Sequence, residues 1–124
     1  MDLVERKSVL VVDDSVFMRF KLKQILEDSG FKVTAEAQSG KEAIEKYTVL
    51  KPGLVTMDII MPTMDGVSAL RAIRQIDPAA KVIMVSSAGL RDQVRESMSA
   101  GAKGFILKPF HDDQVIKAVE QAFE

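Results

Sequence analysis

The sequence predicts an α/β fold, (βα)5, in which five parallel strands alternate with five helices. Short apolar runs rich in β-branched residues recur five times along the chain, which is typical of strands buried on both faces. Stretches with helical spacing of apolar residues separate these runs and indicate one helix after each strand. Because crossovers between parallel strands are right-handed, the helices are expected to cover both faces of the sheet in a three-layer sandwich.

The first two strand–helix units follow from the order of these patterns. Strands are expected from Ser8 and from Lys32, of which the second has the weaker pattern. The first helix stops at Gly30, and the second opens on a capping box in which Ser39 and Glu42 satisfy each other's backbone N–H groups. The inward stripes are expected to be Met18, Leu22, Ile25 and Leu26 in the first helix and Ala43, Tyr47 and Leu50 in the second.

Three further units complete the fold, with strands expected from Leu54, Val82 and Gly104. The third helix follows Asp65-Gly66 and ends at Asp77-Pro78, and the fourth ends at Gly101. The fifth follows His111, which is interpreted as a turn residue, and has two acidic residues near its positive end. The inward stripes are Val67, Leu70 and Ile73, then Val94 and Met98, then Val115, Ala118, Val119, Ala122 and Phe123.

Composition and charge exclude several functions. The 124 residues fit one domain, 1–124, with no separate output domain. Seventeen basic against eighteen acidic residues argue against a protein that grips nucleic acid through its phosphates. Cysteine is absent, no apolar run is long enough to span a membrane, and the charged opening 1–7 does not resemble a signal peptide. We therefore expect a cytoplasmic protein.

Acidic residues close two of the apolar runs. Asp13 and Asp14 follow the first, and Asp58 ends the third. Because the carboxyl ends of parallel strands share one edge of the sheet, the three carboxylates are expected to meet. Such a cluster is costly without a compensating cation, and oxygen ligands with no histidine or cysteine favour Mg²⁺, with Mn²⁺ as an alternative.

Two further strand ends carry groups that suit phosphoryl transfer. Ser86 closes the fourth run and Lys108 follows the fifth. Asp58 stands alone and is the candidate nucleophile for an aspartyl phosphate, while Lys108 would pair with one phosphate oxygen and Ser86 would donate to another. Taken singly, each residue is more simply a helix cap, a turn residue or a polar strand end. Their placement together on one edge favours the functional interpretation.

Four motifs, in this order and spacing, identify a resemblance. They are Val11-Val12-Asp13-Asp14-Ser15, residues 57–66 (MDIIMPTMDG), Val85-Ser86-Ser87-Ala88 and Lys108-Pro109-Phe110. The chain resembles the receiver domains of two-component signalling over nearly its whole length, and residues 13–19 are most similar to those of the stand-alone chemotaxis regulators. The resemblance implies a five-stranded parallel sheet in the order 2-1-3-4-5.

The resemblance also implies roles for individual residues. Asp58 would accept a phosphoryl group from a phosphohistidine on a histidine kinase. Mg²⁺ would be bound by Asp13, Asp14 and Asp58 together with the backbone carbonyl of Ile60. Ser86 and Phe105 would form a switch pair, in which Ser86 turns toward the phosphoryl group and Phe105 rotates inward. Phe105 is otherwise a plain core aromatic, and the Lys108-Pro109 bond is expected to be cis.

The implied output surface lies on the fourth helix, the fifth strand and the fifth helix. Its expected residues are Arg91, Val94, Arg95, Phe105 and Leu107. A flagellar switch protein or another target would bind there. For Arg91 and Arg95, an ordinary solvated helix face is an equally weighted interpretation.

Several positions depart from the commoner family pattern. Ile60 and Ala88 stand where many relatives carry polar side chains that influence the attacking water. We therefore expect slow self-dephosphorylation and dependence on an external phosphatase. Phe105 replaces the more frequent tyrosine and so lacks its hydroxyl, and Gly89 is expected to loosen the start of the fourth helix.

Two other functions compete with a stand-alone receiver. One is a receiver excised from a longer DNA-binding or enzymatic response regulator. The other is a magnesium phosphohydrolase that uses an aspartyl intermediate. That class usually needs a second acid two residues after the nucleophile, where this chain has Ile60, and a cap for which it has no room.

Overall fold

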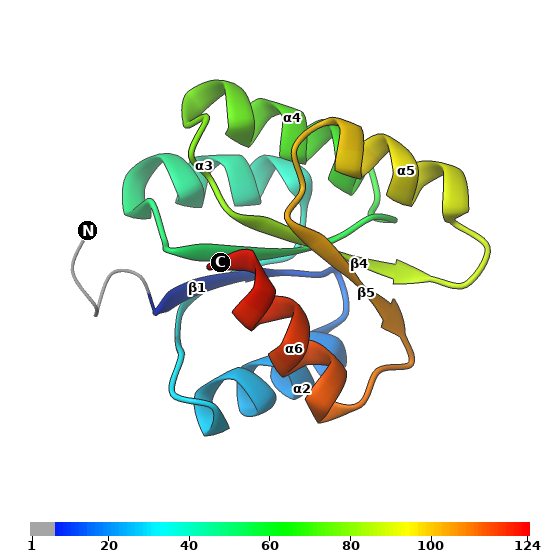
Figure 1. Ribbon diagram of the computed structural model, residues 1–124. Coiled ribbons are helices and arrows are strands. Elements are labelled where there is room, and N and C mark those ends of the chain that lie inside the picture. The colour runs from blue at the N-terminus through cyan, green and yellow to red at the C-terminus, as the bar shows by residue number, and fades with distance from the viewer. Residues whose placement is uncertain (1–6) are drawn as a thin grey trace.

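The computed structural model describes residues 7–124 and contains the alternating strands and helices that the sequence predicts (Figure 1). The strands are β1 (Ser8–Val12), β2 (Lys32–Ala37), β3 (Leu54–Asp58), β4 (Val82–Ser87) and β5 (Gly104–Lys108). The helices are α2 (Val16–Asp28), α3 (Gly40–Leu50), α4 (Gly66–Ile76), α5 (Arg91–Ser99) and α6 (Asp112–Ala122). The charged opening 1–6, part of the segment on which the exclusion of a signal peptide depends, lies outside the described residues.

All strand pairs are parallel, in the order β2-β1-β3-β4-β5, which confirms the predicted topology. Helices α2 and α6 cover one face, and α3, α4 and α5 cover the other (Figure 1). Because the chain order reverses beside β1, the carboxyl ends of β1 and β3 form the point where such sheets bind ligands. Within residues 7–124, no helix has the length and apolar character needed to cross a membrane.

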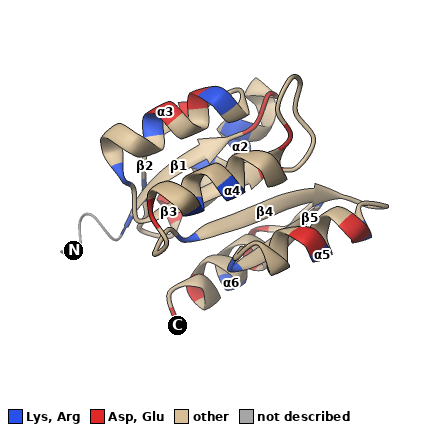
Figure 2. Ribbon diagram, turned by 90° about the horizontal axis from the view of Figure 1, so that it is seen from above, with Lys and Arg blue, Asp and Glu red and all other residues tan. Residues whose placement is uncertain are grey.

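Each face of the sheet has its own hydrophobic core, because successive strand residues point to opposite sides. Leu10, Met57 and Leu70 belong to the core beneath α3, α4 and α5. Val11 and Val119 belong to the core beneath α2 and α6. Charged residues of both signs occupy the outer surfaces of the helices, as on α3 (Figure 2). The central strands are thus buried on both faces, which explains why their sequence patterns are continuous apolar runs.

Hydroxyl and carboxylate caps start three of the helices. Ser15, Ser39 and Asp65 each accept a hydrogen bond from the backbone N–H three residues later. The predicted capping box on α3 is half confirmed: Ser39 caps the helix, whereas the carboxylate of Glu42 lies 2.9 Å from Nζ of Lys46 on the next turn. The side chain of Glu42 therefore forms an ion pair along the helix surface instead of capping the helix.

Two of the predicted inward residues are exposed. Leu50 is 48% exposed, because the chain leaves α3 directly after it through Lys51 in a left-handed conformation, and Ile44 packs against the core instead. Met98 is 44% exposed, so its predicted inward position on α5 is also wrong. The buried residue of that turn is Ser97, whose hydroxyl donates to the Gln93 carbonyl and needs no further partner.

Candidate functional site

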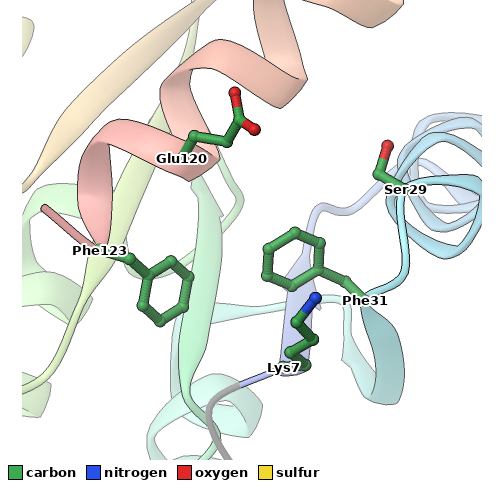
Figure 3. A pocket seen from close by; sticks show the side chains of 5 residues that line it. All are labelled: Lys7, Ser29, Phe31, Glu120 and Phe123. Atoms are coloured by element: carbon green, nitrogen blue, oxygen red, sulfur yellow. The ribbon is translucent and has the colours of Figure 1, made fainter. Parts of the chain in front are cut away.

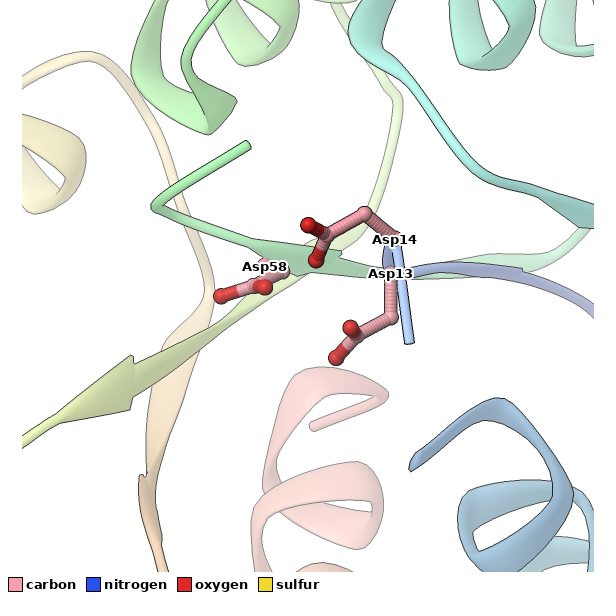
Figure 4. A group of neighbouring side chains, drawn as sticks. All are labelled: Asp13, Asp14 and Asp58. Atoms are coloured by element: carbon pink, nitrogen blue, oxygen red, sulfur yellow. The ribbon is translucent and has the colours of Figure 1, made fainter. Parts of the chain in front are cut away.

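Three carboxylates from two strand ends meet at the carboxyl edge of the sheet (Figure 4). One oxygen from each of Asp13, Asp14 and Asp58 lies within 4.8 Å of the others. Asp13 and Asp58 are buried, whereas Asp14 is exposed. The predicted convergence of these residues is therefore confirmed, and the cluster is open to solvent on the side of Asp14.

Backbone hydrogen bonds fix the end of β1. The amide of Asp13 donates to the Ala37 carbonyl at 3.0 Å, and Oδ1 of Asp13 accepts from the Ser15 amide at 2.9 Å. Nη1 of Arg19 donates to the Asp13 carbonyl at 2.7 Å, while Nε of the same side chain pairs with Glu36 at 3.0 Å. Sequence reasoning gave Arg19 no role, since an arginine in the first turns of a helix is normally solvated.

The loop after β3 folds back against the end of that strand. The amide of Gly66 donates to the Ile59 carbonyl at 2.7 Å, and a Cβ at Gly66 would lie 2.1 Å from the carbonyl oxygen of Asp58. Only glycine permits so close an approach. Within this loop, the backbone amide of Met64 donates to the Pro62 carbonyl. Thr63, between these two residues, has a φ of +72°, so the three residues form a γ-turn. The motif at 57–66 therefore builds the loop as well as supplying Asp58.

Lys108 reaches the carboxylates from the end of β5. Its Nζ lies 3.1 Å from Oδ2 of Asp13 and 3.5 Å from Oδ2 of Asp58. The Lys108-Pro109 peptide bond is cis, as expected. One cation thus bridges two buried anions, and the position predicted for Lys108 at the acidic cluster is confirmed.

The surroundings of Asp58 alter its proton affinity. Burial and, to a smaller extent, the nearby Asp13 carboxylate together raise the pKa of Asp58 to about 6. The ammonium group of Lys108 and a hydrogen bond from the backbone of Ile60 lower the pKa and partly offset this effect. At neutral pH, Asp58 is ionised but poorly compensated, which favours reaction with or coordination of an electrophile.

Ser86 and Phe105 both line a groove bordered by β4, β5 and the start of α5. The groove has a volume of about 380 Å³ and is lined by Ser86, Ser87, Ala88, Gly89, Leu90, Arg91, Val94, Phe105 and Leu107. Ser86 is buried, and its hydroxyl donates to the Ser87 carbonyl at 2.8 Å. Phe105 is 49% exposed and Leu107 51% exposed. Of the predicted output residues, Arg95 is exposed on α5 but does not line the groove.

Another cavity, of about 290 Å³, lies among Lys7, Ser29, Phe31, Glu120 and Phe123 (Figure 3). These residues precede β1 and β2 or lie at the ends of α2 and α6, so the cavity is at the end of the sheet opposite the carboxylates. The rings of Phe31 and Phe123 stack with centroids 6.0 Å apart. The Nζ of Lys7 lies 5.4 Å from the Phe31 centroid. These contacts fasten the end of α6 and contribute nothing to the acidic site.

The oxygen set at the carboxyl edge fits a hard divalent cation. Three carboxylates converge, two of them buried, and Lys108 supplies only a single positive charge to them. Mg²⁺ is characteristically bound by one or two carboxylates together with water and phosphate oxygens, which requires an open side such as the one at Asp14. The geometry is therefore that of an acidic site suited to Mg²⁺ or a similar ion.

Comparison with known proteins gives the family. The model of the response regulator receiver domain matches residues 9–120. The chain belongs to this family. CheY of Bacillus subtilis is 50% identical over 113 residues, covering 91% of this chain and 94% of its own length. CheY of Thermotoga maritima is 50% identical over 115 residues, covering 93% of this chain and 96% of its own length.

Solved structures agree with this assignment. CheY in a CheX–CheY complex with BeF3 and Mg²⁺ from Borrelia burgdorferi is 41% identical, with a TM-score of 0.90 over 94% of this chain and 89% of that one. The response regulator domain of Thermotoga maritima CheB is 40% identical, with a TM-score of 0.83 over 93% of this chain and 94% of that one. The chain is thus a chemotaxis response regulator of the CheY type, a phosphoacceptor signalling protein and not a conventional enzyme.

Proposed function

We propose that this receiver takes a phosphoryl group onto Asp58 from a CheA-like histidine kinase and thereby changes its affinity for a partner in chemotaxis, such as a flagellar switch protein. The observation that carries the proposal is the convergence of Asp13, Asp14 and Asp58 around one edge, with Nζ of Lys108 among them. The buried acceptor and the neighbouring cation are the equipment that phosphoryl transfer requires. A cytoplasmic location is proposed with it, because such a kinase presents its phosphohistidine there.

In the proposed reaction, a carboxylate oxygen of Asp58 forms a bond to phosphorus while the bond from phosphorus to the imidazole nitrogen of the donor breaks. The released imidazole takes up a proton from solvent. Lys108 pairs with a phosphoryl oxygen and holds charge that develops there. Asp13, Asp14, Asp58 and the Ile60 carbonyl would bind Mg²⁺, which supplies charge neutralisation at the phosphoryl oxygens when bound.

The groove beside Ser86 connects this reaction to the output surface. Ser86 lines the groove together with Arg91, Val94 and Phe105, and its hydroxyl is held by a backbone carbonyl and not by the carboxylates. On phosphorylation, Ser86 donates to the phosphoryl group and Phe105 rotates from its exposed position into the groove. The binding surface therefore has two arrangements, with Phe105 outside or inside the groove. Phosphorylation shifts the equilibrium between them by as much as the phosphoryl group interacts more favourably with one than with the other.

Loss of the phosphoryl group is proposed to be slow without a helper protein. Ile60 lies two residues after Asp58 and Ala88 two residues after Ser86, and neither has a polar side chain that could orient an attacking water. The Borrelia burgdorferi relative was solved in complex with CheX, which supports a protein partner at this step. A phosphoryl group that disappears within seconds from the purified protein would contradict this part of the proposal.

The central experiment is incubation with acetyl phosphate and Mg²⁺ followed by intact mass measurement. The parent protein is expected to gain one phosphoryl group, and Asp58→Asn is expected to gain none. Asp28→Asn, an exposed carboxylate at the far end of α2, is the matched control and should be modified like the parent. Equal modification of the parent and Asp58→Asn would refute Asp58 as the acceptor.

A further inference from the structure

One buried hydroxyl among residues 7–124 has no hydrogen-bond partner in the protein. It is Oγ1 of Thr56, a residue with no exposed surface in the middle of β3. Other buried hydroxyls are satisfied: Tyr47 donates to Asp77, Ser86 to the Ser87 carbonyl and Ser97 to the Gln93 carbonyl. An unsatisfied buried hydroxyl is unfavourable, so Thr56 calls for an explanation that the rest of the core does not need.

The strand register places Thr56 directly below the acidic site. Thr56 pairs with Val11 on β1, and two residues further along the strands lie Asp58 and Asp13. Because side chains alternate along a strand, the Thr56 side chain is on the same face as those two carboxylates. Two residues correspond to about 6.6 Å at a rise of about 3.3 Å per residue, which is too long for a direct hydrogen bond and suits one bridging water.

The simpler interpretation is that Thr56 only fills the core. Its β-branched shape suits a strand, and its neighbours across the sheet are Val11 and Ile83. Valine would fill nearly the same volume without an unsatisfied hydroxyl. A purely structural Thr56 therefore predicts that Thr56→Val stabilises the protein and leaves the acidic site unchanged.

We propose that Thr56 is a positioning residue whose hydroxyl proton is donated, through one internal water, to the carboxylates of Asp13 and Asp58. The inference rests on the proposed function, in which these carboxylates bind Mg²⁺ and one of them accepts the phosphoryl group. Hydrogen bonds from outside the ligand set orient metal ligands, and their loss typically weakens metal binding about 10- to 100-fold. Thr56 thus supports the site from within the core.

The test compares Thr56→Val and Thr56→Ser with the parent by Mg²⁺ titration calorimetry and by the kinetics of phosphorylation with acetyl phosphate. Thr56→Val is expected to weaken Mg²⁺ binding about tenfold, with a matching rise in the Mg²⁺ concentration needed for half-maximal phosphorylation. Thr56→Ser keeps the hydroxyl and should return both quantities nearly to the parent values. Unchanged Mg²⁺ affinity in a thermally stabilised Thr56→Val would overturn the proposal.

Two controls separate the possible failures. Ser97→Ala removes a buried hydroxyl on α5, away from the carboxylates, and should leave Mg²⁺ affinity unchanged. If Thr56→Val does not fold, Thr56→Ala against Thr56→Ser isolates the hydroxyl, and equal Mg²⁺ affinity in that pair refutes the proposal. A parent protein that neither binds Mg²⁺ nor becomes phosphorylated refutes the proposed function itself, which the parent measurements reveal before any Thr56 variant is compared.

Discussion

Helices α4 and α5 cover the same face of the sheet but are attached to it very differently. Helix α4 follows β3, the strand that ends in Asp58. It is capped by Asp65 and buries five residues, Gly66, Val67, Ala69, Leu70 and Ile73. Helix α5 follows β4, has Leu90 at its N-cap position with no side-chain cap, and buries only Ser97. Gly89, with φ of +92°, lies just before it. The unit that carries Asp58 is thus firmly packed, while the unit beside Ser86 is lightly held.

This difference suits the proposed switch, which needs a rigid reaction site and a binding surface that can change its arrangement. The carboxylates must keep their geometry through the reaction, which a well-packed α4 and the close contact of Gly66 with Asp58 ensure. The responding surface must have two arrangements of similar free energy, and regions with few buried apolar contacts are those that open or shift most easily. We infer that α5 and the groove beside it are the mobile half of the pair.

The largest expected difference is in core packing. Leu70→Ala on α4 should lower the free energy of unfolding by about 3 kcal/mol, because it leaves a cavity in a fully buried position. Met98→Ala on α5 should change it by less than about 0.5 kcal/mol, because Met98 is 44% exposed and belongs to neither hydrophobic core. Urea denaturation monitored by circular dichroism measures both. Similar losses at the two positions would remove the contrast between the helices.

The second prediction concerns the effect of the buried Asp58 carboxylate on the free energy of unfolding. The pKa of Asp58, at about 6, lies above its unfolded value of about 3.9, so the folded state holds this proton more tightly. Protonation of Asp58 therefore makes its whole contribution to the free energy of unfolding below about pH 4, and this contribution is lost as the pH rises through about 6. Without Mg²⁺, Asp58→Asn should be roughly 2 kcal/mol more stable than the parent above pH 7, and this gain should vanish near pH 4.

Denaturation curves for the parent and Asp58→Asn at several pH values, in the presence of a chelator, measure this difference. Asp28→Asn, which removes an exposed carboxylate at the far end of α2, serves as the control. Adding Mg²⁺ should stabilise the parent more than Asp58→Asn, because the ion binds only the folded site. If the gain in stability of Asp58→Asn did not depend on pH, the ionised Asp58 carboxylate would not be the cause of the destabilisation.

The third prediction concerns the caps. Asp65→Ala should lower the free energy of unfolding by about 1 kcal/mol, because the amide of Ser68 loses its acceptor at the start of α4. Asp65→Asn retains an acceptor oxygen and should lose clearly less. Hydrogen exchange should locate the effect in the first turn of α4, while α5, which has no side-chain cap to lose, should exchange faster in all three proteins. Slower exchange in α5 than in α4 would contradict the comparison.

The topology and the acidic cluster were predictable because each depends on local pattern. Buried parallel strands are apolar along their whole length, and the residue that ends a strand must lie at the shared edge. Asp13, Asp58 and Lys108 could therefore be placed together from three separate strand ends. The exposed positions of Leu50 and Met98 were not predictable, because helical spacing gives the inward direction but not where a neighbouring element stops covering the helix.

Contacts made across the fold also escaped prediction. Arg19 is held by the Asp13 carbonyl and by Glu36, 17 residues away, and nothing near it in the sequence indicates either partner. Gly66 is part of a recognisable motif, but its close approach to the Asp58 carbonyl appears only when the loop is built. Thr56 looks like an ordinary strand residue until its hydroxyl is seen to lack a partner. These residues support the site without carrying its chemistry.

The smallest expected effect tests what joins the two helices. Arg71 on α4 and Glu96 on α5 form an ion pair of 3.1 Å in which both side chains are about half exposed. A double-mutant cycle with Arg71→Gln and Glu96→Gln should give a coupling of about 0.3 kcal/mol that disappears in high salt. A coupling above about 1.5 kcal/mol would mean that α5 is firmly tied to α4 through its surface. The light attachment of α5 would then have to be abandoned as the basis of the switch.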